Sequence, residues 1–209
     1  MKHVHAILIL LLLAVLASGC VSGVPASPYA NATPGKKLYD LGNASQWTYA
    51  VNMSANETAS EWNMTVHNYA GSPRHMVIHT LGNGMDITYD VWWNQTTYRV
   101  ERMHANGSIG DYHQDHDVSP LQIQTLPDTG LNYYFVPFQP IRTVTAKGPD
   151  GSMANLTVYA ATDNQGFTVA YWVHPAVPVP AKVLMSTRDF NITMMLTNYT
   201  ASRPISPPV

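Results

Sequence analysis

The stretch GDYHQDHDVSP, residues 110–120, carries the densest group of side chains that could bind a metal. His113 and His116 are separated by two residues, and Asp115 and Asp117 lie beside them. Imidazole nitrogens and carboxylate oxygens are ligands for Zn²⁺ and Cu²⁺. If the stretch is a loop, one turn could present two imidazoles and a carboxylate to one ion. This spacing predicts a divalent-metal site made of His113, His116, Asp115 and Asp117.

Three more histidines could complete such a site. His75 and His79 stand four residues apart in an apparent strand, on one face of it, and His104 ends another apparent strand. The HxxH spacing has low specificity without cysteines, and the HExxH motif of zinc proteases is absent. A polar loop that is rich in histidine because it is solvated explains the same residues and is the favoured interpretation. We therefore expect no cofactor, with zinc or copper as the alternative.

Patterns typical of enzymes are missing. The sequence has no G-x-S-x-G, P-loop or Rossmann fingerprint. Glu57, Glu61 and Glu101 are the only glutamates. Asp86 and Asp90 share a predicted strand face at a separation of about 13 Å, which is too long for the carboxylate pair of a retaining glycosidase. The sequence therefore predicts a protein that is not an enzyme.

Cys20 is the only cysteine, and it follows a stretch built like a secretory signal. A positive start with Lys2 precedes an apolar run from Ala6 to Ala17. That run is shorter than the ~20 apolar residues that cross a bilayer. A cysteine directly after small residues resembles the lipobox of bacterial and archaeal lipoproteins, although Ala17 stands where that motif usually has Leu. We expect Cys20 to be lipidated; cleavage nearby with a free thiol, or an uncleaved anchor, are the alternatives.

The chain divides by composition into four parts. Residues 1–19 form the predicted lipoprotein-type signal peptide. Residues 20–37, with the lipidated Cys20, are rich in Pro, Ser, Gly and Ala and predict a flexible stalk. Residues 38–202 are long enough for one domain with its own core. Residues 203–209 are rich in proline and predict a disordered tail.

Asparagine occurs in an unusual pattern. Ten of the fourteen asparagines begin an Asn-x-Ser/Thr sequence, where chance would give about two. Asn31 is the weakest of the ten because Pro34 follows it. The excess predicts an exported glycoprotein of an archaeal cell surface. The expected glycosylation sites are Asn43, Asn52, Asn56, Asn63, Asn94, Asn106, Asn155, Asn191 and Asn198.

The charge of the chain excludes one class of partner. The formal net charge is -2 and charged residues make up 11% of the sequence, with no basic stripe. Nucleic-acid binding is therefore not expected. The sequence also has no basic amphipathic helix that could bind anionic lipid, so membrane attachment would depend on the lipid at Cys20 alone. The expected location is the outer face of the cytoplasmic membrane.

The body of the chain alternates between apolar and polar residues with a period of two, which predicts β-strands. In WTYAVNMS, Trp47, Tyr49, Val51 and Met53 alternate with polar or small residues, and EWNMTVH repeats the pattern. About ten such segments follow one another in hairpins, and the only plausible short helix lies in residues 117–138, where prolines interrupt it. A meander of this length must curl to cover its apolar face. The fold class expected is mainly β, a curved antiparallel sheet or open half-barrel with at most a short helical plug.

A late segment of the chain carries a family resemblance. An aromatic residue, Trp and Val are followed by a Pro-rich bend and Lys; the residues are Tyr171, Trp172, Val173, Pro175, Pro178, Pro180 and Lys182. This order resembles small lipoproteins of methanogenic archaea and, more remotely, the periplasmic lipoprotein-carrier (LolA- or LppX-like) half-barrel. The similarity covers about the last forty residues in detail and the rest in pattern. It implies a concave apolar surface suited to a lipid or another hydrophobic ligand.

These observations predict a lipid-anchored, N-glycosylated surface protein with a non-catalytic role. The leading hypothesis is a module that binds a lipophilic ligand or a lipoprotein in its concave sheet. A divalent-metal-binding protein that uses the His113 and His116 stretch, and a structural or adhesive envelope protein, are the alternatives.

Overall fold

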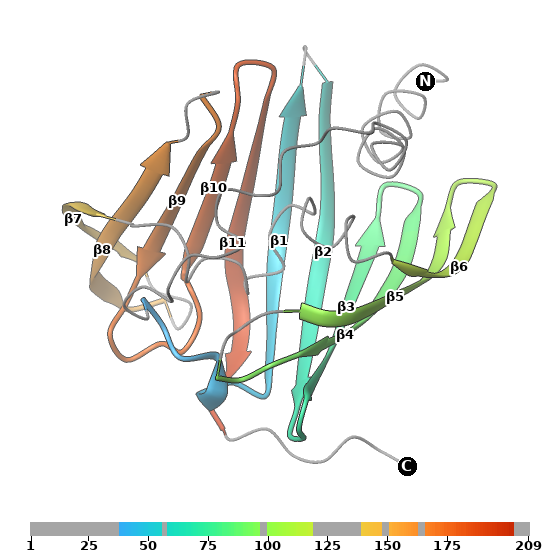
Figure 1. Ribbon diagram of the computed structural model, residues 1–209. Coiled ribbons are helices and arrows are strands. Elements are labelled where there is room, and N and C mark those ends of the chain that lie inside the picture. The colour runs from blue at the N-terminus through green and yellow to red at the C-terminus, as the bar shows by residue number, and fades with distance from the viewer. Residues whose placement is uncertain are drawn as a thin grey trace.

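The computed structural model describes residues 38–55, 58–96, 100–118, 139–147, 151–162 and 166–202. These residues form one short 3₁₀ helix and eleven strands of a single antiparallel sheet (Figure 1). The elements in chain order are η2 (Leu41–Asn43), β1 (Gln46–Ala55), β2 (Thr58–Tyr69), β3 (Arg74–Gly82), β4 (Met85–Trp93), β5 (Val100–Ile109), β6 (Tyr112–Val118), β7 (Gln139–Lys147), β8 (Met153–Thr162), β9 (Thr168–Val173), β10 (Lys182–Ser186) and β11 (Phe190–Thr200).

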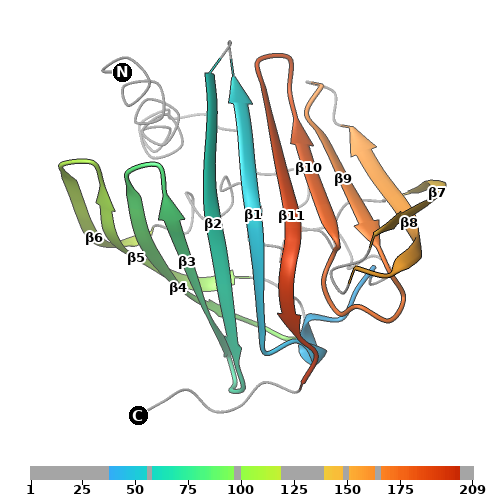
Figure 2. The same cartoon turned by 180° about the vertical axis from the view of Figure 1, so that it is seen from behind.

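The strand order in the sheet is β6-β5-β4-β3-β2-β1-β11-β10-β9-β8-β7. Strands that follow one another in sequence pair with each other, apart from β6 and β7, which lie at opposite edges. In addition β1 pairs with β11, from Gln46 opposite Thr200 to Ala55 opposite Phe190. The chain therefore makes two meanders, β1–β6 and β7–β11, and the β1–β11 ladder joins them in the middle of the sheet (Figure 2).

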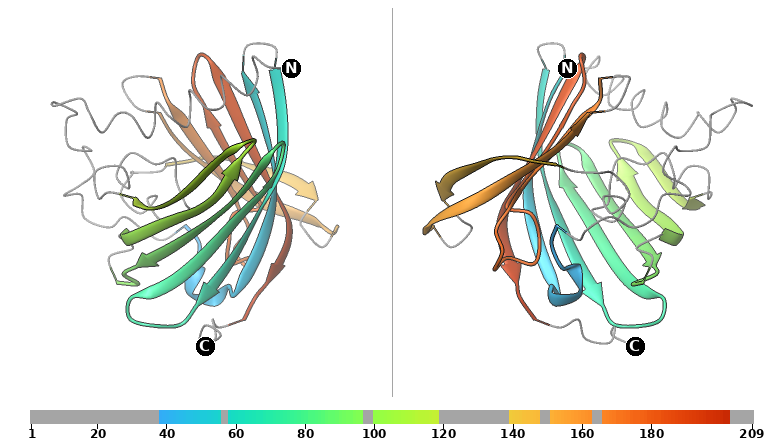
Figure 3. Two further views of the ribbon diagram at one scale, coloured as in Figure 1. Left: turned by 90° about the vertical axis from the view of Figure 1, so that its right-hand side faces the viewer. Right: turned by 60° about the vertical axis from the view of Figure 1, so that its left-hand side comes forward.

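The sheet is curved and does not close, and β6 and β7 are its two edges (Figure 3). The predicted fold class, an open half-barrel of meandering antiparallel strands, is confirmed. The predicted number of strands is too low by one, because residues 112–118 form β6 and pair with β5 instead of forming a polar loop. Most of the predicted helical segment, residues 119–138, lies outside the described residues, as do the predicted signal peptide, stalk and tail.

The two faces of the sheet differ because side chains alternate along each strand. We call the face that lines the concave side the inner face and the opposite one the outer face. In β1, the inner residues Trp47, Tyr49 and Val51 are buried, whereas Asn52 on the outer face is exposed. β9 is an exception: Ala170 on its outer face and Tyr171 on its inner face are both buried. Burial on both faces accounts for its nearly unbroken apolar sequence.

Within the described ranges, no helix combines the length and the apolar character needed to cross a membrane.

Candidate functional site

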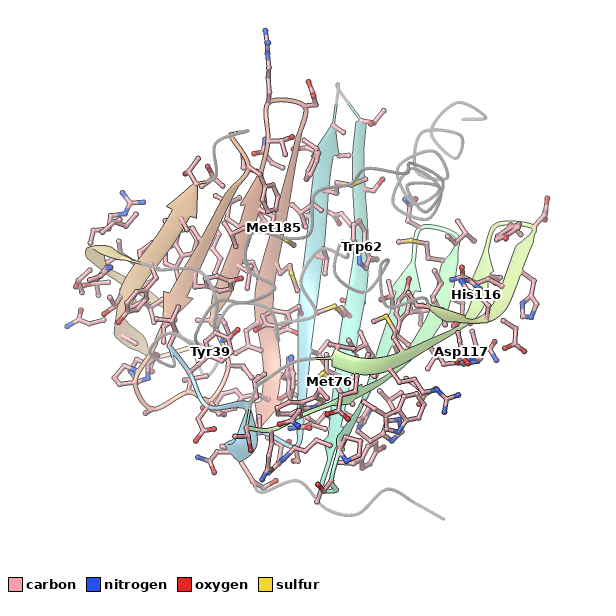
Figure 4. All side chains as sticks on the ribbon, viewed as in Figure 1. Tyr39, Trp62, Met76, His116, Asp117 and Met185 are labelled. Atoms are coloured by element: carbon pink, nitrogen blue, oxygen red, sulfur yellow. The ribbon has the colours of Figure 1, made fainter. Side chains whose placement is uncertain are left out.

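The inner face carries a continuous apolar surface. A cluster of 22 buried residues extends over β1 to β6, β9, β10, β11 and the segments at one end of the strands. Trp62, Met76 and Met185 of this face come from strands in both meanders (Figure 4). The register explains the continuity, since Trp62 of β2 pairs with Val51 of β1, which in turn pairs with Met194 of β11. The inner face is therefore one surface shared by both meanders.

One end of the half-barrel is closed by the chain itself. Residues 38–45, with η2, pack there because the Asn68 side chain, which is 1% exposed, donates hydrogen bonds to the carbonyls of Leu41 at 2.9 Å and Ala44 at 3.0 Å. Residues 174–181 pack beside them, and the hydroxyl of Tyr49 donates a buried hydrogen bond of 2.8 Å to the carbonyl of Pro180. We call this the closed end.

Burial on the inner face is incomplete in the middle of the sheet. On β1, Tyr49 and Val51 are buried but Met53 is only partly buried, and on β11 Leu196 and Met194 are buried but Ile192 is partly buried. Other inner-face side chains that are only partly buried are Trp62, Met64 and Val169. Large apolar side chains are thus left within reach of a ligand on the concave side of the sheet.

A small polar group interrupts this apolar face near the edge strand β6. Gln114 and His116 project from the inner face of β6, and Tyr89 projects from the inner face of β4. Between them, β5 contributes only Ala105 and Gly107, because Ala105 pairs with both Tyr89 and His116 and Gly107 pairs with Gln114. We call Tyr89, Gln114 and His116 the polar corner.

The electrostatics of the polar corner favour hydrogen-bond donors. Burial raises the pKa of the Tyr89 hydroxyl, and the hydrogen-bonding influence of the neighbouring Gln114 amide lowers it by a smaller amount. Tyr89 therefore stays protonated at neutral pH. Gln114 is 5% exposed, and its Nε2 atom makes no hydrogen bond of ordinary geometry, although the amide lies near enough to the Tyr89 hydroxyl to lower its pKa. A buried amide group without a partner costs about 1–3 kcal/mol, so this atom is poised to bind an acceptor.

The outer face of β3–β6 is built differently. His75 bonds Asp90 at 2.7 Å, and His79 bonds Asp86 at 2.8 Å. The cross-strand register places these partners on adjacent strands, where they face each other directly or diagonally. We call the whole set the outer grid; its members are His75, His79, Asp86, Asp90, Trp92, Arg102, His104, Asp115 and Asp117.

The centre of the outer grid is a stack of planar side chains. The ring of His75 lies 4.9 Å from that of Trp92 with planes 7° apart, and Cζ of the Arg102 guanidinium lies 4.8 Å from the centroid of the Trp92 ring. Arg102 also reaches Asp117 at 3.2 Å. The hydrogen bond from His104, followed by that from Arg102, lowers the pKa of the Asp117 carboxyl below its ordinary value. These groups satisfy one another, and the grid serves as a stabilising surface.

The residues predicted to bind a metal are not brought together as a set. Strand alternation places His113, Asp115 and Asp117 on the outer face and His116 on the inner face. Asp115 and Asp117 instead bond the two ring nitrogens of His104, at 3.0 Å from Nε2 and 3.1 Å from Nδ1. In the part of the chain that the structure describes, no group of three or more His, Cys, Asp or Glu residues is arranged to hold a metal ion. The loop that the metal prediction assumed is strand β6.

The other histidines of the prediction lie on the outer face. His75 and His79 share that face of β3, as expected, but each is engaged by its own aspartate. Their partners, Asp90 and Asp86, are the two acids that the sequence places on one strand face.

The predicted glycosylation sites are accessible where the structure describes them. Of the eight described, Asn94 is half-buried and donates a hydrogen bond of 3.1 Å to Glu101. The other seven are exposed: Asn43, Asn52, Asn63, Asn106, Asn155, Asn191 and Asn198. Asn56, Asn31 and the predicted lipidation site Cys20 lie outside the described residues.

Two residues of the site escaped the sequence analysis. In β2 every second residue points inward, and Asn68 follows Trp62, Met64 and Val66 in this series. The alternation in the sequence could therefore have revealed Asn68 as a buried polar side chain. Gln114 has no such signal, because its neighbours in sequence are all polar and only the pairing with β5 places it inside.

Known proteins give limited guidance. No protein-family model matches the chain, and no curated protein matches it. Among solved structures, it is similar to a DUF1329 family protein from Desulfovibrio piger, with 10% identity over 78% of this chain and 88% of that one, at a TM-score of 0.40. The Pseudomonas aeruginosa MucA/MucB complex matches with 12% identity over 80% of this chain and 55% of that one, at a TM-score of 0.44. The lipoprotein LppX of Mycobacterium tuberculosis matches with 12% identity over 79% of this chain and 88% of that one, at a TM-score of 0.42.

Proposed function

We propose that this is a non-catalytic binding protein that holds a lipophilic ligand against the inner face of its half-barrel. The observation that supports this is the group of large apolar side chains on that face, Met53, Trp62 and Ile192, that the protein leaves only partly buried. Covering apolar surface contributes about 25 cal/mol per Å², so a molecule that covers several such side chains gains several kcal/mol.

The arrangement of these side chains fits an elongated apolar molecule. Met53 lies on β1, Trp62 on the adjacent β2 and Ile192 on the adjacent β11. A chain that lies across these three strands touches all three side chains on the concave side. A single acyl chain or similar lipophilic molecule is the occupant that we propose.

We also propose that the protein is held at the outer face of the cytoplasmic membrane by a lipid on Cys20 and carries glycans on the outer face of its sheet. The exposed asparagines Asn52, Asn63, Asn106 and Asn191 all lie on the outer face of their strands, opposite the proposed ligand. Sugars at these positions would leave the inner face free. An intact mass of the native material equal to that of the bare polypeptide would contradict both modifications.

Ligand binding can be tested with a neutral apolar dye, N-phenyl-1-naphthylamine, and the full chain carrying Cys20→Ser. We expect saturable dye fluorescence, and we expect Ile192→Ser to weaken binding about tenfold because a polar group replaces an apolar contact. Met195→Ser is the matched control, since Met195 lies on the same strand, is 44% exposed and faces outward. Equal effects of the two substitutions, or no saturable binding, would contradict the proposal.

A further inference from the structure

We propose that the polar corner, Tyr89, Gln114 and His116, binds the polar end of the ligand, and that this end is a hydrogen-bond acceptor such as a carboxylate. The inference rests on the proposed function and names the class of ligand: a lipophilic molecule that ends in an oxygen acceptor.

The first argument is the unsatisfied donor. Gln114 is 5% exposed and its Nε2 atom makes no hydrogen bond of ordinary geometry, although buried amide groups in folded proteins are nearly always hydrogen-bonded. The group lies on the inner face of β6, the same face that carries the apolar surface. A ligand oxygen would supply the acceptor that the protein does not.

The second argument is that neighbouring groups can donate as well. The Tyr89 hydroxyl remains protonated because burial raises its pKa, and it lies beside the Gln114 amide. The imidazole of half-buried His116 is on the next inward position of β6 and always carries at least one N–H. No carboxylate is among the three members of the corner, so a ligand carboxylate meets no negative charge from them.

The third argument is the continuity of the polar corner with the apolar face. On β5, which lies between the strands of Tyr89 and Gln114, the inner positions are occupied by Ala105 and Gly107, so no large side chain separates the two groups. Gly107 is held at φ +144°, and a Cβ there would lie 2.7 Å from Cα of Ile87, so β5 approaches β4 in a way that only glycine allows. Tyr89 packs against both apolar clusters of the inner face, and Trp62 does too. An acyl chain beside Trp62 can therefore end at the polar corner.

Two soluble probes with the same chain separate an acceptor from a donor. Dodecanoate ends in an acceptor, and dodecylammonium ends in donors only. We expect the full chain with Cys20→Ser to bind dodecanoate at least tenfold more tightly, measured by displacement of N-phenyl-1-naphthylamine. One hydrogen bond from a buried donor to a charged acceptor is sufficient for a difference of about this size.

Substitutions in the polar corner then test whether its residues cause the preference for dodecanoate over dodecylammonium. Gln114→Leu should reduce it to about threefold or less, and Gln114→Glu should reverse it. Tyr89→Phe removes a donor with little change in volume and should reduce the preference even if a substitution at Gln114 impairs folding. His113→Leu is the matched control, because His113 lies next to Gln114 on β6 but faces outward and is exposed, and it should leave the preference unchanged.

The outcomes distinguish the two proposals. If neither amphiphile displaces the dye and the dye itself does not bind, the proposed function fails and the inference fails with it. If both amphiphiles bind equally well, or if the preference survives in Gln114→Leu and Tyr89→Phe, only the assignment of the polar corner is overturned. Retained folding of each variant is checked by near-ultraviolet circular dichroism.

Discussion

The two faces of strands β3–β6 are built from alternating residues of the same segments, but different interactions dominate on each. On the inner face, Met76, Val91 and Trp93 are fully buried in an apolar cluster. On the outer face, His75 and Trp92 belong to a grid of ion pairs and stacked rings that remains partly exposed. Exposed ion pairs contribute little, whereas buried apolar groups contribute several kcal/mol each. We infer that the inner face holds the fold together and that the outer face mainly keeps the strands in register and in solution.

The test with the largest expected effect on stability compares two adjacent tryptophans. Trp93 is 0% exposed on the inner face, and Trp92 lies between His75 and Arg102 on the outer face. We expect Trp93→Ala to lower the free energy of unfolding by about 3–5 kcal/mol and Trp92→Ala by about 1–2 kcal/mol. Urea denaturation of both variants measures the difference. Similar losses of unfolding free energy in the two variants would show that the stack around Trp92 stabilises the fold as much as the core around Trp93 does.

A second test concerns the close approach of the backbones of β4 and β5 at Gly107. Gly107→Ala introduces a Cβ against Cα of Ile87 at a φ of +144°, and we expect a loss of about 3 kcal/mol. Gly110→Ala is the control: its φ is +58°, but a Cβ there has nothing within 4 Å, and we expect about 1 kcal/mol. Thermal unfolding followed by circular dichroism gives both values. A tolerated Gly107→Ala would mean that β4 and β5 can move apart.

A third test compares polar groups on the two faces. Asn68→Ala removes two buried hydrogen bonds to the backbone at the closed end, and we expect it to cost about 2–3 kcal/mol. Thr65→Ala, on the outer face of the same strand, removes a hydrogen bond of 3.2 Å to Thr48 and should cost about 0.5–1 kcal/mol. Hydrogen exchange at residues 41–45 should rise only in Asn68→Ala. Equal exchange in both variants would contradict the role given to Asn68.

The smallest effect is expected from the outer grid, and it depends on pH. Because the bonds from His104 and Arg102 lower the pKa of Asp117 in the folded state, its contribution to stability is present above the ordinary value of 3.8. That contribution is lost as the pH falls through the lowered value. We expect Asp117→Asn to lower the urea midpoint slightly at neutral pH and not at all near pH 2.

The control for this pH experiment is Asp111→Asn, in the turn between β5 and β6, where the midpoint should stay the same at both pH values. A constant difference between Asp117→Asn and the wild type across the pH range would contradict the explanation by ionisation.

The fold was largely predictable because the strands alternate so regularly. Trp47, Tyr49 and Val51 are apolar at every second position, so one buried face could be predicted without knowing its neighbours. Strand β6 could not, since its inner positions 114 and 116 are Gln and His and the alternation of polarity is missing. The number of strands was therefore one too few.

The candidate site was less predictable than the fold. The metal prediction assumed that His113 and His116 would converge, but residues three apart in a strand point to opposite faces. The polar corner depends on which residues of β5 lie opposite β6, and a small residue such as Gly107 gives no sign in the sequence of what packs over it. Register between strands decides such a site, and register depends on the turns and on the pattern of both paired strands, not on a single residue.

The central ladder between β1 and β11 has a consequence for how the chain folds. All the other strand pairs join neighbours in sequence and can form as local hairpins, whereas the β1–β11 ladder brings together the two ends of the described chain. Closing so long a loop is entropically costly, and contacts of this kind slow folding. We expect the two meanders to acquire structure early and their docking to limit the rate, so that Met194→Ala in this ladder slows refolding more than it speeds unfolding.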